Sequence, residues 1–160
     1  MKPERVEQLM SRNVATCREH DSLNVPAQIM WERDCGIVPV TVPEEAGERV
    51  VGVVTDRDAC MGAYTQGRPL TEVPVSIAMS RVVHTCTPDQ SVKDALKQMA
   101  AARVRRLPVV DDAGHLVGLL SLSDVMREEA RSQKVVSSDE FAKTVGTIAS
   151  PRAHQVMVAA

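Results

Sequence analysis

The sequence predicts an α+β protein made of two copies of one unit, in which a strand, a helix, two further strands and a second helix follow one another. Two observations carry this prediction. A set of matched residues recurs along the chain, and each copy combines short apolar stretches rich in β-branched residues with segments of helical apolar spacing. A chain of 160 residues is long enough to bury a sizeable core in two closely joined half-domains.

The internal repeat starts at a Met-Ser-Arg triplet, which occupies residues 10–12 and returns at residues 79–81, 69 positions later. The same offset matches several later positions, namely Cys17 with Cys86, Ser22 with Ser91, Met30 with Met99 and Pro39 with Pro108. Beyond the turn at 43–48 the offset becomes 66, because the matching turn at 111–115 is shorter. Surface turns accept such differences at little energetic cost, so we expect the two copies to share one fold.

Each copy is expected to contain the same elements in the same order. The first helix of the second copy opens at Ser91, where Asp94 completes a relative of the capping box, and the matching helix of the first copy opens at Ser22. Pro26 is acceptable in the first turn of that helix, and Gly36 provides a left-handed end for it. The strands are expected at 13–17, 37–42 and 50–55 and at 82–86, 106–110 and 116–121, and the second helices near 56–66 and 122–133.

These elements define the organisation of the chain. The predicted parts are a first repeat at 8–66, a linker at 67–77, a second repeat at 78–133 and a C-terminal tail at 134–160. The linker contains the Gly and Pro residues that are typical of turns. The tail is polar and then weakly apolar without a clear period, so we expect it to be loose, with a short helix near 139–145.

The overall composition excludes several classes of protein. The net charge is −2 and the only aromatic residues are Trp31, Tyr64 and Phe141, so the chain lacks the basic field and the stacking platforms with which proteins bind nucleic acid. The charged N-terminal segment is not a signal peptide, and no apolar run reaches the ~18 residues of a membrane span. We therefore expect a cytoplasmic protein with no membrane segment. Trp31 is interpreted as a packing anchor or a dimer contact.

The cysteines show no metal-binding pattern. They are Cys17, Cys35, Cys60 and Cys86, and none belongs to a C-x-x-C pair. We therefore expect reduced thiols and no metal site. Cys17 and Cys86 occupy matching positions, close along the chain to His20 and His84, which leaves a metal or redox role as an alternative to packing as small buried apolar groups.

The strongest functional signal is the pattern Gly-apolar-apolar-Thr/Ser-x-x-Asp, which occurs once in each copy. Its residues are Gly52, Thr55 and Asp58 in the first copy and Gly118, Ser121 and Asp124 in the second. The glycine permits close approach of a ligand or of a neighbouring backbone. The hydroxyl residue stands where a strand meets a helix N-terminus, which favours phosphate, and the carboxylate can accept two hydrogen bonds from a ribose diol. Helix capping is the alternative explanation, and one residue can serve both roles.

The chain contains no recognisable catalytic motif. No P-loop, G-x-G-x-x-G, G-x-S-x-G or H-E-x-x-H pattern is present, and no nucleophile is paired with a base at a familiar spacing. We therefore expect a binding module that is not an enzyme and that holds no catalytic cofactor.

The repeat order, the Pro-Val hairpins and the two motif endings resemble a tandem pair of cystathionine-β-synthase (CBS) domains, also called a Bateman module. The resemblance extends over residues 8–131. It implies pseudo-symmetric repeats packed through their sheets, a homodimer, and a regulatory ligand such as AMP, ADP or ATP. The implied function is an energy or metabolite sensor that acts on a protein partner encoded as a separate chain. The alternative is an interaction scaffold whose clefts are vestigial.

The resemblance also implies two ligand clefts between the copies. The main cleft is expected to comprise Val53, Thr55, Arg57, Asp58, Val82, His84, Arg105 and Arg106. The second cleft is expected to comprise Val14, Ala15, Gly36, Ile37, Leu119, Ser121 and Asp124. Because guanidinium groups suit phosphate oxygens, the arginines predict tighter nucleotide binding in the main cleft. The second cleft is expected to be weak, empty or selective for adenosine with little phosphate. This expectation fails if Asp124→Ala abolishes binding while Asp58→Ala does not.

Overall fold

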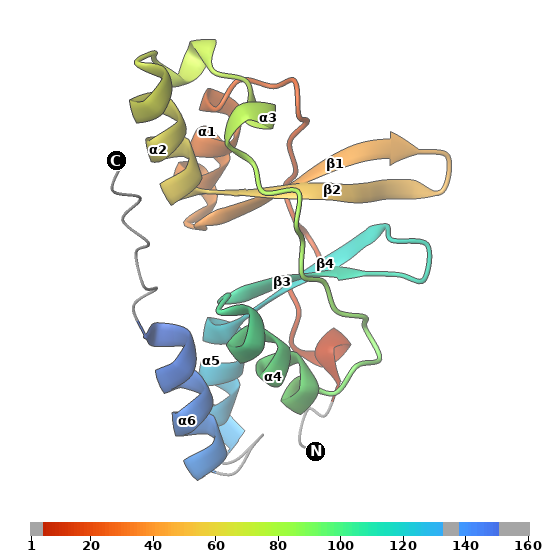
Figure 1. Ribbon diagram of the computed structural model, residues 1–160. Helices are drawn as coiled ribbons and strands as arrows, with labels where there is room; N and C mark the ends of the chain where they lie inside the picture. Colours follow the sequence, from red (N-terminus) through yellow and green to blue (C-terminus); the bar gives the residue numbers. More distant parts are fainter. Residues whose placement is uncertain (1–4, 133–137, 151–160) are drawn as a thin grey trace.

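The fold is described from a computed structural model of the chain, covering residues 5–132 and 138–150. Two β-hairpins lie side by side at the centre of the molecule, with α1, α2 and α3 beyond one hairpin and α4, α5 and α6 beyond the other (Figure 1). The hairpins contact each other through β2 and β4. This arrangement confirms the predicted α+β fold of two similar lobes. No helix among the described residues is both long and apolar enough to cross a bilayer.

The first lobe is organised around an antiparallel hairpin. Its elements are α1 (Asn24–Arg33), β1 (Ile37–Glu44), β2 (Gly47–Thr55), α2 (Asp56–Gln66), a 3-10 turn η2 (Leu70–Glu72) and α3 (Val75–Ala78). Val38 lies opposite Val54, and a bulge falls between Val40 and Thr41. The three valines are fully buried, so the β-branched side chains that favour strand structure also form the centre of this lobe's core.

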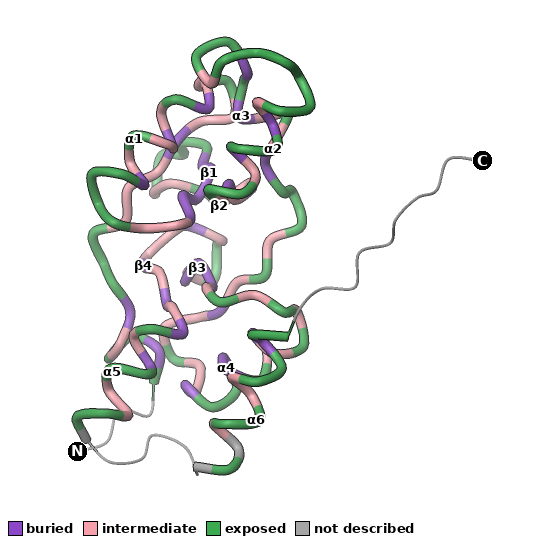
Figure 2. The backbone as a smooth tube through the Cα atoms, turned by 90° about the vertical axis from the view of Figure 1, so that its left-hand side faces the viewer, coloured by how far each residue is buried: buried purple, intermediate pink, exposed green. Residues whose placement is uncertain are grey.

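The second lobe repeats this organisation. Its elements are α4 (Val92–Ala102), β3 (Arg106–Val110), β4 (Leu116–Ser121), α5 (Leu122–Ser132) and α6 (Ser138–Ala149). A bulge falls between Val109 and Val110, at the position that matches the bulge of the first hairpin. Buried residues follow the strands and the inner faces of the helices in both lobes (Figure 2). The sequence repeat is therefore also a structural repeat.

The segments 13–17 and 82–86, expected to be strands, are extended but make only one bridge each. Cys17 pairs with Val40, and Cys86 pairs with Val109. The prediction of full strands is wrong for a simple reason. A parallel ladder would next need an N–H group from Pro39, or from Pro108 in the second lobe, and proline has none.

The helix ends differ in part from the prediction. Ser91 caps α4 as expected, because its side chain accepts a hydrogen bond of 3.0 Å from the backbone of Asp94. Ser22 does not cap α1, which begins at Asn24 without a side-chain cap. The left-handed residue after α1 is Asp34 (φ 50°) rather than Gly36, because the helix ends earlier than expected and aspartate tolerates this conformation.

Each lobe is completed by a segment that precedes the other copy. Val6 and Met10 pack in the core of the second lobe, whereas Val75 and Met79 pack in the core of the first. Backbone hydrogen bonds show the same exchange of segments between the lobes. Val6 N donates to Gln90 O at 3.0 Å, and Val75 N donates to Asp21 O at 2.8 Å. The predicted linker at 67–77 therefore contributes directly to a core.

The C-terminal region contains a longer helix than expected. α6 spans Ser138–Ala149, and its Phe141, Val145 and Ile148 pack on the core of the second lobe. The prediction of a loose tail is wrong for this segment, because these residues recur at helical spacing and cover α4. The other residues of the predicted tail, 134–137 and 151–160, lie outside the described residues.

Candidate ligand-binding clefts

Thr55 and Asp58 form a reciprocal cap at the start of α2. The Asp58 backbone donates to Thr55 Oγ1 at 3.2 Å, and Thr55 donates to Asp58 Oδ2 through its backbone at 2.9 Å and its hydroxyl at 2.7 Å. The capping explanation is therefore confirmed for this motif. Both bonds to the carboxylate use Oδ2, and Asp58 is only half-buried. Oδ1 of Asp58 is consequently left as an acceptor for a ligand.

Ser121 and Asp124 form the same cap at the start of α5, with one difference. The Ser121 backbone donates to Asp124 Oδ2 at 2.9 Å, and Asp124 donates back to the hydroxyl at 3.2 Å. Here Oδ1 is already paired with Arg127, one turn further along the helix. The matching residue of the first copy is Met61, which cannot form such a pair. The two motif carboxylates therefore differ in their availability.

Backbone hydrogen bonds join each motif strand to the other copy. Val53 exchanges two hydrogen bonds with Ser80, of 3.0 and 2.9 Å. Leu119 exchanges two of 2.9 Å with Ser11. The end of β2 therefore lies against the segment leading to Val82, and the end of β4 lies against the segment leading to Val14. These contacts bring together the chain segments from which each cleft was expected to form.

The motif glycines serve these same contacts. A Cβ atom on Gly52 would lie 3.0 Å from the carbonyl oxygen of Ser80 and 3.0 Å from Met79 Cε. A Cβ atom on Gly118 would meet the Ser11 carbonyl oxygen at 3.0 Å and would lie still closer to the Met10 side chain. Of the two explanations for the glycines, the structure supports the close approach of neighbouring chain rather than of a ligand.

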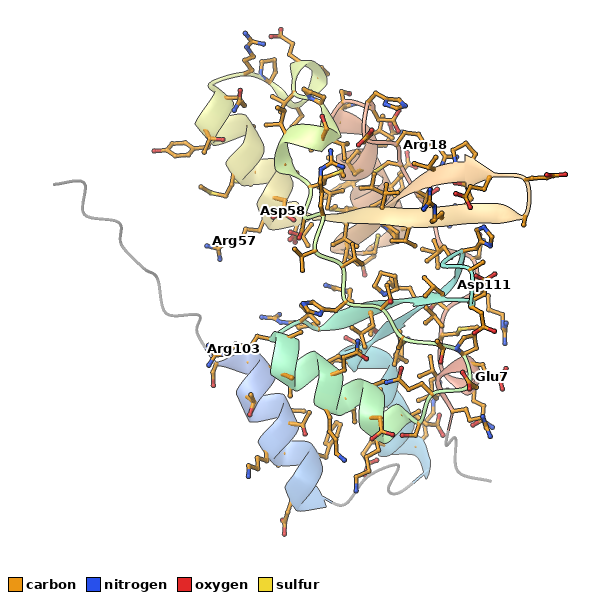
Figure 3. All side chains as sticks on the ribbon, turned by 45° about the vertical axis from the view of Figure 1, so that its right-hand side comes forward. Glu7, Arg18, Arg57, Asp58, Arg103 and Asp111 are labelled. Atoms are coloured by element: carbon orange, nitrogen blue, oxygen red, sulfur yellow. The ribbon has the colours of Figure 1, made fainter. Side chains whose placement is uncertain are left out.

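The three arginines expected in the main cleft come from both copies, and Arg106 of the second copy lies near Gly36 and Asp56 of the first. Arg57 and Arg105 are exposed and Arg106 is half-buried. Among the described residues, none of their guanidinium groups has a hydrogen-bonding or ion-pairing partner. Figure 3 shows Arg57 with Asp58 at the end of the first lobe that faces the second lobe. A group of unpaired cations beside a half-open carboxylate suits a ligand that carries both hydroxyl and phosphate groups.

Gly36 lies beside an arginine that was assigned to the other cleft. Arg106 Nη2 and Asp56 Oδ2 each lie 3.4 Å from the position that a Cβ of Gly36 would occupy. Gly36 was assigned to the second cleft, but the structure places it beside an arginine of the main cleft.

The remaining predicted residues differ in exposure. Val82 is 74% exposed and His84 is also exposed, so both are accessible. Val14 and Ala15 are half-buried. Ile37 is buried in the core, so only its backbone is available to a ligand.

The buried cysteines act as apolar groups. Cys17 and Cys86 are each 2% exposed, and burial raises the pKa of each thiol to about 12. His20 and His84, the histidines considered with them, are both exposed. Among the residues that the structure describes, no group of His, Cys, Asp and Glu side chains has the arrangement needed to hold a metal ion.

Sequence reasoning missed a pocket that two of the arginines line. It has a volume of ≈ 290 Å³ and is lined by Arg105, Arg106 and Ser123 together with Ile148 and Ala149 of α6. The signal that would have found α6 is the helical spacing of its apolar residues. Nothing in the sequence connects the end of that helix to the arginines, because the contact depends on tertiary packing.

The chain belongs to the CBS-domain family, since the family model for the CBS domain matches residues 6–61 and 72–131. It is 32% identical to the CBS domain-containing protein YhcV of Bacillus subtilis, over 83% of this chain and 91% of that protein. Its fold matches a putative signal-transduction protein with CBS domains from Burkholderia ambifaria (TM-score 0.70, 27% identity, 84% of this chain and 99% of that chain).

A further solved structure is informative about ligands. The chain resembles the CBS domain pair of protein MJ0100 in complex with 5′-methylthioadenosine and S-adenosyl-L-methionine, with a TM-score of 0.67, 25% identity, and coverage of 77% of this chain and 93% of that chain. Together these similarities confirm the tandem CBS pair. A CBS pair of this kind is a regulatory module, and the chain is such a module.

Proposed function

We propose that this module binds an adenine nucleotide (AMP, ADP or ATP) in the main cleft and acts as a sensor without catalytic activity of its own. The observation that carries the proposal is that Arg106 of the second copy lies near the start of α2, the helix whose first turn holds the half-open carboxylate of Asp58, and that Arg57, Arg105 and Arg106 have no partners among the described residues. The adenosine compounds bound to the CBS pair of MJ0100 support the nucleoside part of the proposal.

The two halves of the ligand would use different groups. Oδ1 of Asp58 accepts a hydrogen bond from the ribose, while Oδ2 continues to cap α2. The exposed side chain of Val82 offers an apolar surface to the base. The arginines bind phosphate oxygens through charge-assisted hydrogen bonds, which are about twice as strong as neutral ones. Capping and binding are thereby compatible in one residue.

The second cleft is proposed to bind the same ligands more weakly. Its carboxylate, Asp124, is already paired with Arg127, and two of its expected members, Ile37 and Gly36, are buried or displaced toward the main cleft. The competition from Arg127 lowers the gain in free energy when a ribose binds there.

The regulatory output is proposed to reach a separate protein chain in the cytoplasm. A ligand shifts a regulatory equilibrium only by its differential affinity for two states, so the partner must bind the occupied and empty forms unequally. Trp31 is 89% exposed and Tyr64 78% exposed, which excludes an internal packing role for Trp31 and leaves α1 and α2 as the proposed dimer surface. An interaction scaffold with unused clefts is the competing function.

Calorimetric titration with adenosine, AMP, ADP and ATP tests the proposal, using Asp58→Asn and Asp124→Asn as a matched pair. Both substitutions alter the same kind of cap, so a difference between them reports on the ligand. We expect Asp58→Asn to weaken binding by about tenfold or more and Asp124→Asn to leave the tighter site intact. The absence of binding to any of these compounds would favour the scaffold, and the reverse order of effects would move the main site to the second cleft.

A further inference from the structure

The pocket beside α6 combines positive charge with an apolar wall. It opens between the start of β3, the first turn of α5 and the last turn of α6, and its volume is ≈ 290 Å³. Arg105, Arg106 and Ser123 supply its polar groups, and Met126 and Ile148 are among its apolar ones. Ligand sites usually measure about 300–1,000 Å³. The pocket therefore suits a part of a ligand rather than a whole nucleotide.

Neither arginine of the pocket forms an ion pair within the described part of the chain. Neither guanidinium group has a hydrogen-bonding or ion-pairing partner in the described part of the chain, and no carboxylate belongs to the pocket lining. Ser123 adds a hydroxyl donor. Two arginines and a hydroxyl among the lining residues, with no carboxylate in the lining, supply the donors that phosphate oxygens accept from.

Arg106 links the pocket to the main cleft. Arg106 lines the pocket, and its guanidinium also lies beside Gly36 and the carboxylate of Asp56 at the start of α2. Asp56 is two residues before Asp58 on the same helix. A nucleotide held at its ribose by Asp58 therefore has its phosphate chain close to this pocket.

We propose that the pocket binds the terminal phosphoryl groups of a nucleoside di- or triphosphate, and that α6 forms one wall of this subsite. The proposal rests on the nucleotide site proposed above and deepens it, because it makes the main cleft selective for ADP and ATP over AMP and adenosine. The wall is firmly placed: Ile148 is 5% exposed within the core, and Phe141 and Val145 anchor the preceding turns of α6. Ala149, the last residue of the helix, is exposed at the pocket.

This arrangement links ligand binding to a helix outside the repeated units. α6 runs back along the second lobe so that its C-terminal end points toward the first lobe, on the side where α2 begins (Figure 1). A bound phosphate chain would contact both the arginines of the second copy and the end of α6. Ligands without these phosphates would make no contact with α6. Contact with the helix would therefore depend on how many phosphate groups the ligand carries.

A carboxylate placed in the pocket tests the proposal. In Ala149→Glu the new negative charge faces the arginines, and we expect the dissociation constants of ATP and inorganic tripolyphosphate to rise by about tenfold or more. Ala149→Gln introduces a side chain of similar size without the charge, and we expect it to raise the dissociation constants less than Ala149→Glu does. Ala142→Glu is the matched control, since it places the same side chain on an exposed position of α6, two turns from the pocket.

The measurements are calorimetric titrations of the full chain, with thermal unfolding of each ligand-free variant to confirm that it folds. Equal affinity of Ala149→Glu and Ala142→Glu for ATP and tripolyphosphate overturns the pocket proposal, even if both variants bind adenosine. Failure of the unaltered protein to bind adenosine, AMP or ATP overturns the nucleotide function instead. In that case, tripolyphosphate binding that Ala149→Glu weakens would still support an anion site at α6.

Discussion

The Nε2 atom of His115 lies 3.0 Å from Oε2 of Glu44, which joins the end of the second hairpin to the end of the first. His115 is 7% exposed, and its Nδ1 lies 3.2 Å from Oδ2 of Asp111. Arg49 forms an ion pair of 2.6 Å with the same Glu44. One imidazole ring therefore lies between carboxylates of both lobes, and Figure 3 shows Asp111 at this end of the second hairpin.

The first prediction concerns the pH dependence of this contact. The hydrogen bond to Glu44, followed by the contribution of Asp111, raises the pKa of His115 above its ordinary value of 6.5. Because the pKa is higher in the folded state, the protonated imidazole stabilises the folded protein, and this stabilisation is fully present below pH 6.5. It is lost as the pH rises through the folded-state pKa. Urea unfolding should show that His115→Gln costs more stability at pH 6 than at pH 9. A cost that does not depend on pH would show that the imidazolium contributes nothing.

The second prediction concerns Glu48, which accepts a hydrogen bond of 2.7 Å from Arg18 and one of 2.8 Å from Thr41. The hydrogen bond from Arg18 is the main cause that lowers the pKa of Glu48 to about 2. This stabilisation is present above pH 4.5 and is lost as the pH falls toward 2. Because the carboxylate is 38% exposed, solvent screens the pair, and Glu48→Gln should cost only about 1 kcal/mol at pH 7.

The measurement for Glu48 is the free energy of unfolding in urea at pH 7 and at pH 3. Glu45→Gln, an exposed neighbour in the same turn, is the control and should change stability by less than about 0.5 kcal/mol. A cost for Glu48→Gln that is as large at pH 3 as at pH 7 would contradict the prediction.

The third prediction uses two glycines in different surroundings. A Cβ on Gly118 would meet both the Met10 side chain and the Ser11 backbone, so Gly118→Ala should destabilise the protein by about 1–3 kcal/mol. Gly146 lies within α6 with nothing within 4 Å of its Cβ position, so Gly146→Ala should stabilise it by about 0.5–1 kcal/mol. Thermal unfolding of the two variants checks the opposite signs, and a neutral Gly118→Ala would show that the two segments are not in close contact.

The fourth prediction exchanges the residues that make the two motif carboxylates unequal. Met61→Arg should pair with the free oxygen of Asp58 and weaken the main cleft, whereas Arg127→Met should release Asp124 and strengthen the second. Adenosine is the suitable probe, because it carries no phosphate that the new arginine could attract. Calorimetry should show about a fivefold or larger change in opposite directions, as expected for a charge-assisted hydrogen bond.

The result of this exchange also bears on the assignment of the clefts. Unchanged affinity in both variants would show that neither carboxylate contacts the ribose. The unaltered protein gives the reference affinity for adenosine. Arg57→Gln gives the reference for a change that affects the binding of phosphate groups.

The hairpins and the four helices of the repeats could be predicted from the sequence because each depends on local patterns. Val38, Val40 and Val54 belong to apolar stretches rich in β-branched residues, and Ser91 stands where a cap is needed. The repeat also helped, because a pattern that is ambiguous in one copy can be assigned from the matching residues of the other copy. The motif carboxylates and their caps were located for the same reason.

The features that were missed depend on distant parts of the chain. Whether residues 13–17 form a strand depends on the N–H group that Pro39 lacks on the neighbouring strand. The packing of Val6 in the second lobe, and the position of Ala149 beside the arginines, follow from the tertiary arrangement alone.

The exchange of Val6 and Met10 for Val75 and Met79 has a consequence for how the chain folds. Each hydrophobic core contains residues from outside its own hairpin and helices, so neither lobe has a complete interior by itself. We expect a single cooperative unfolding transition rather than two, and a half-length chain should fold only as a pair that exchanges the same segment. The chain can be regarded as such a pair joined end to end, in which the exchange of segments takes place within one molecule.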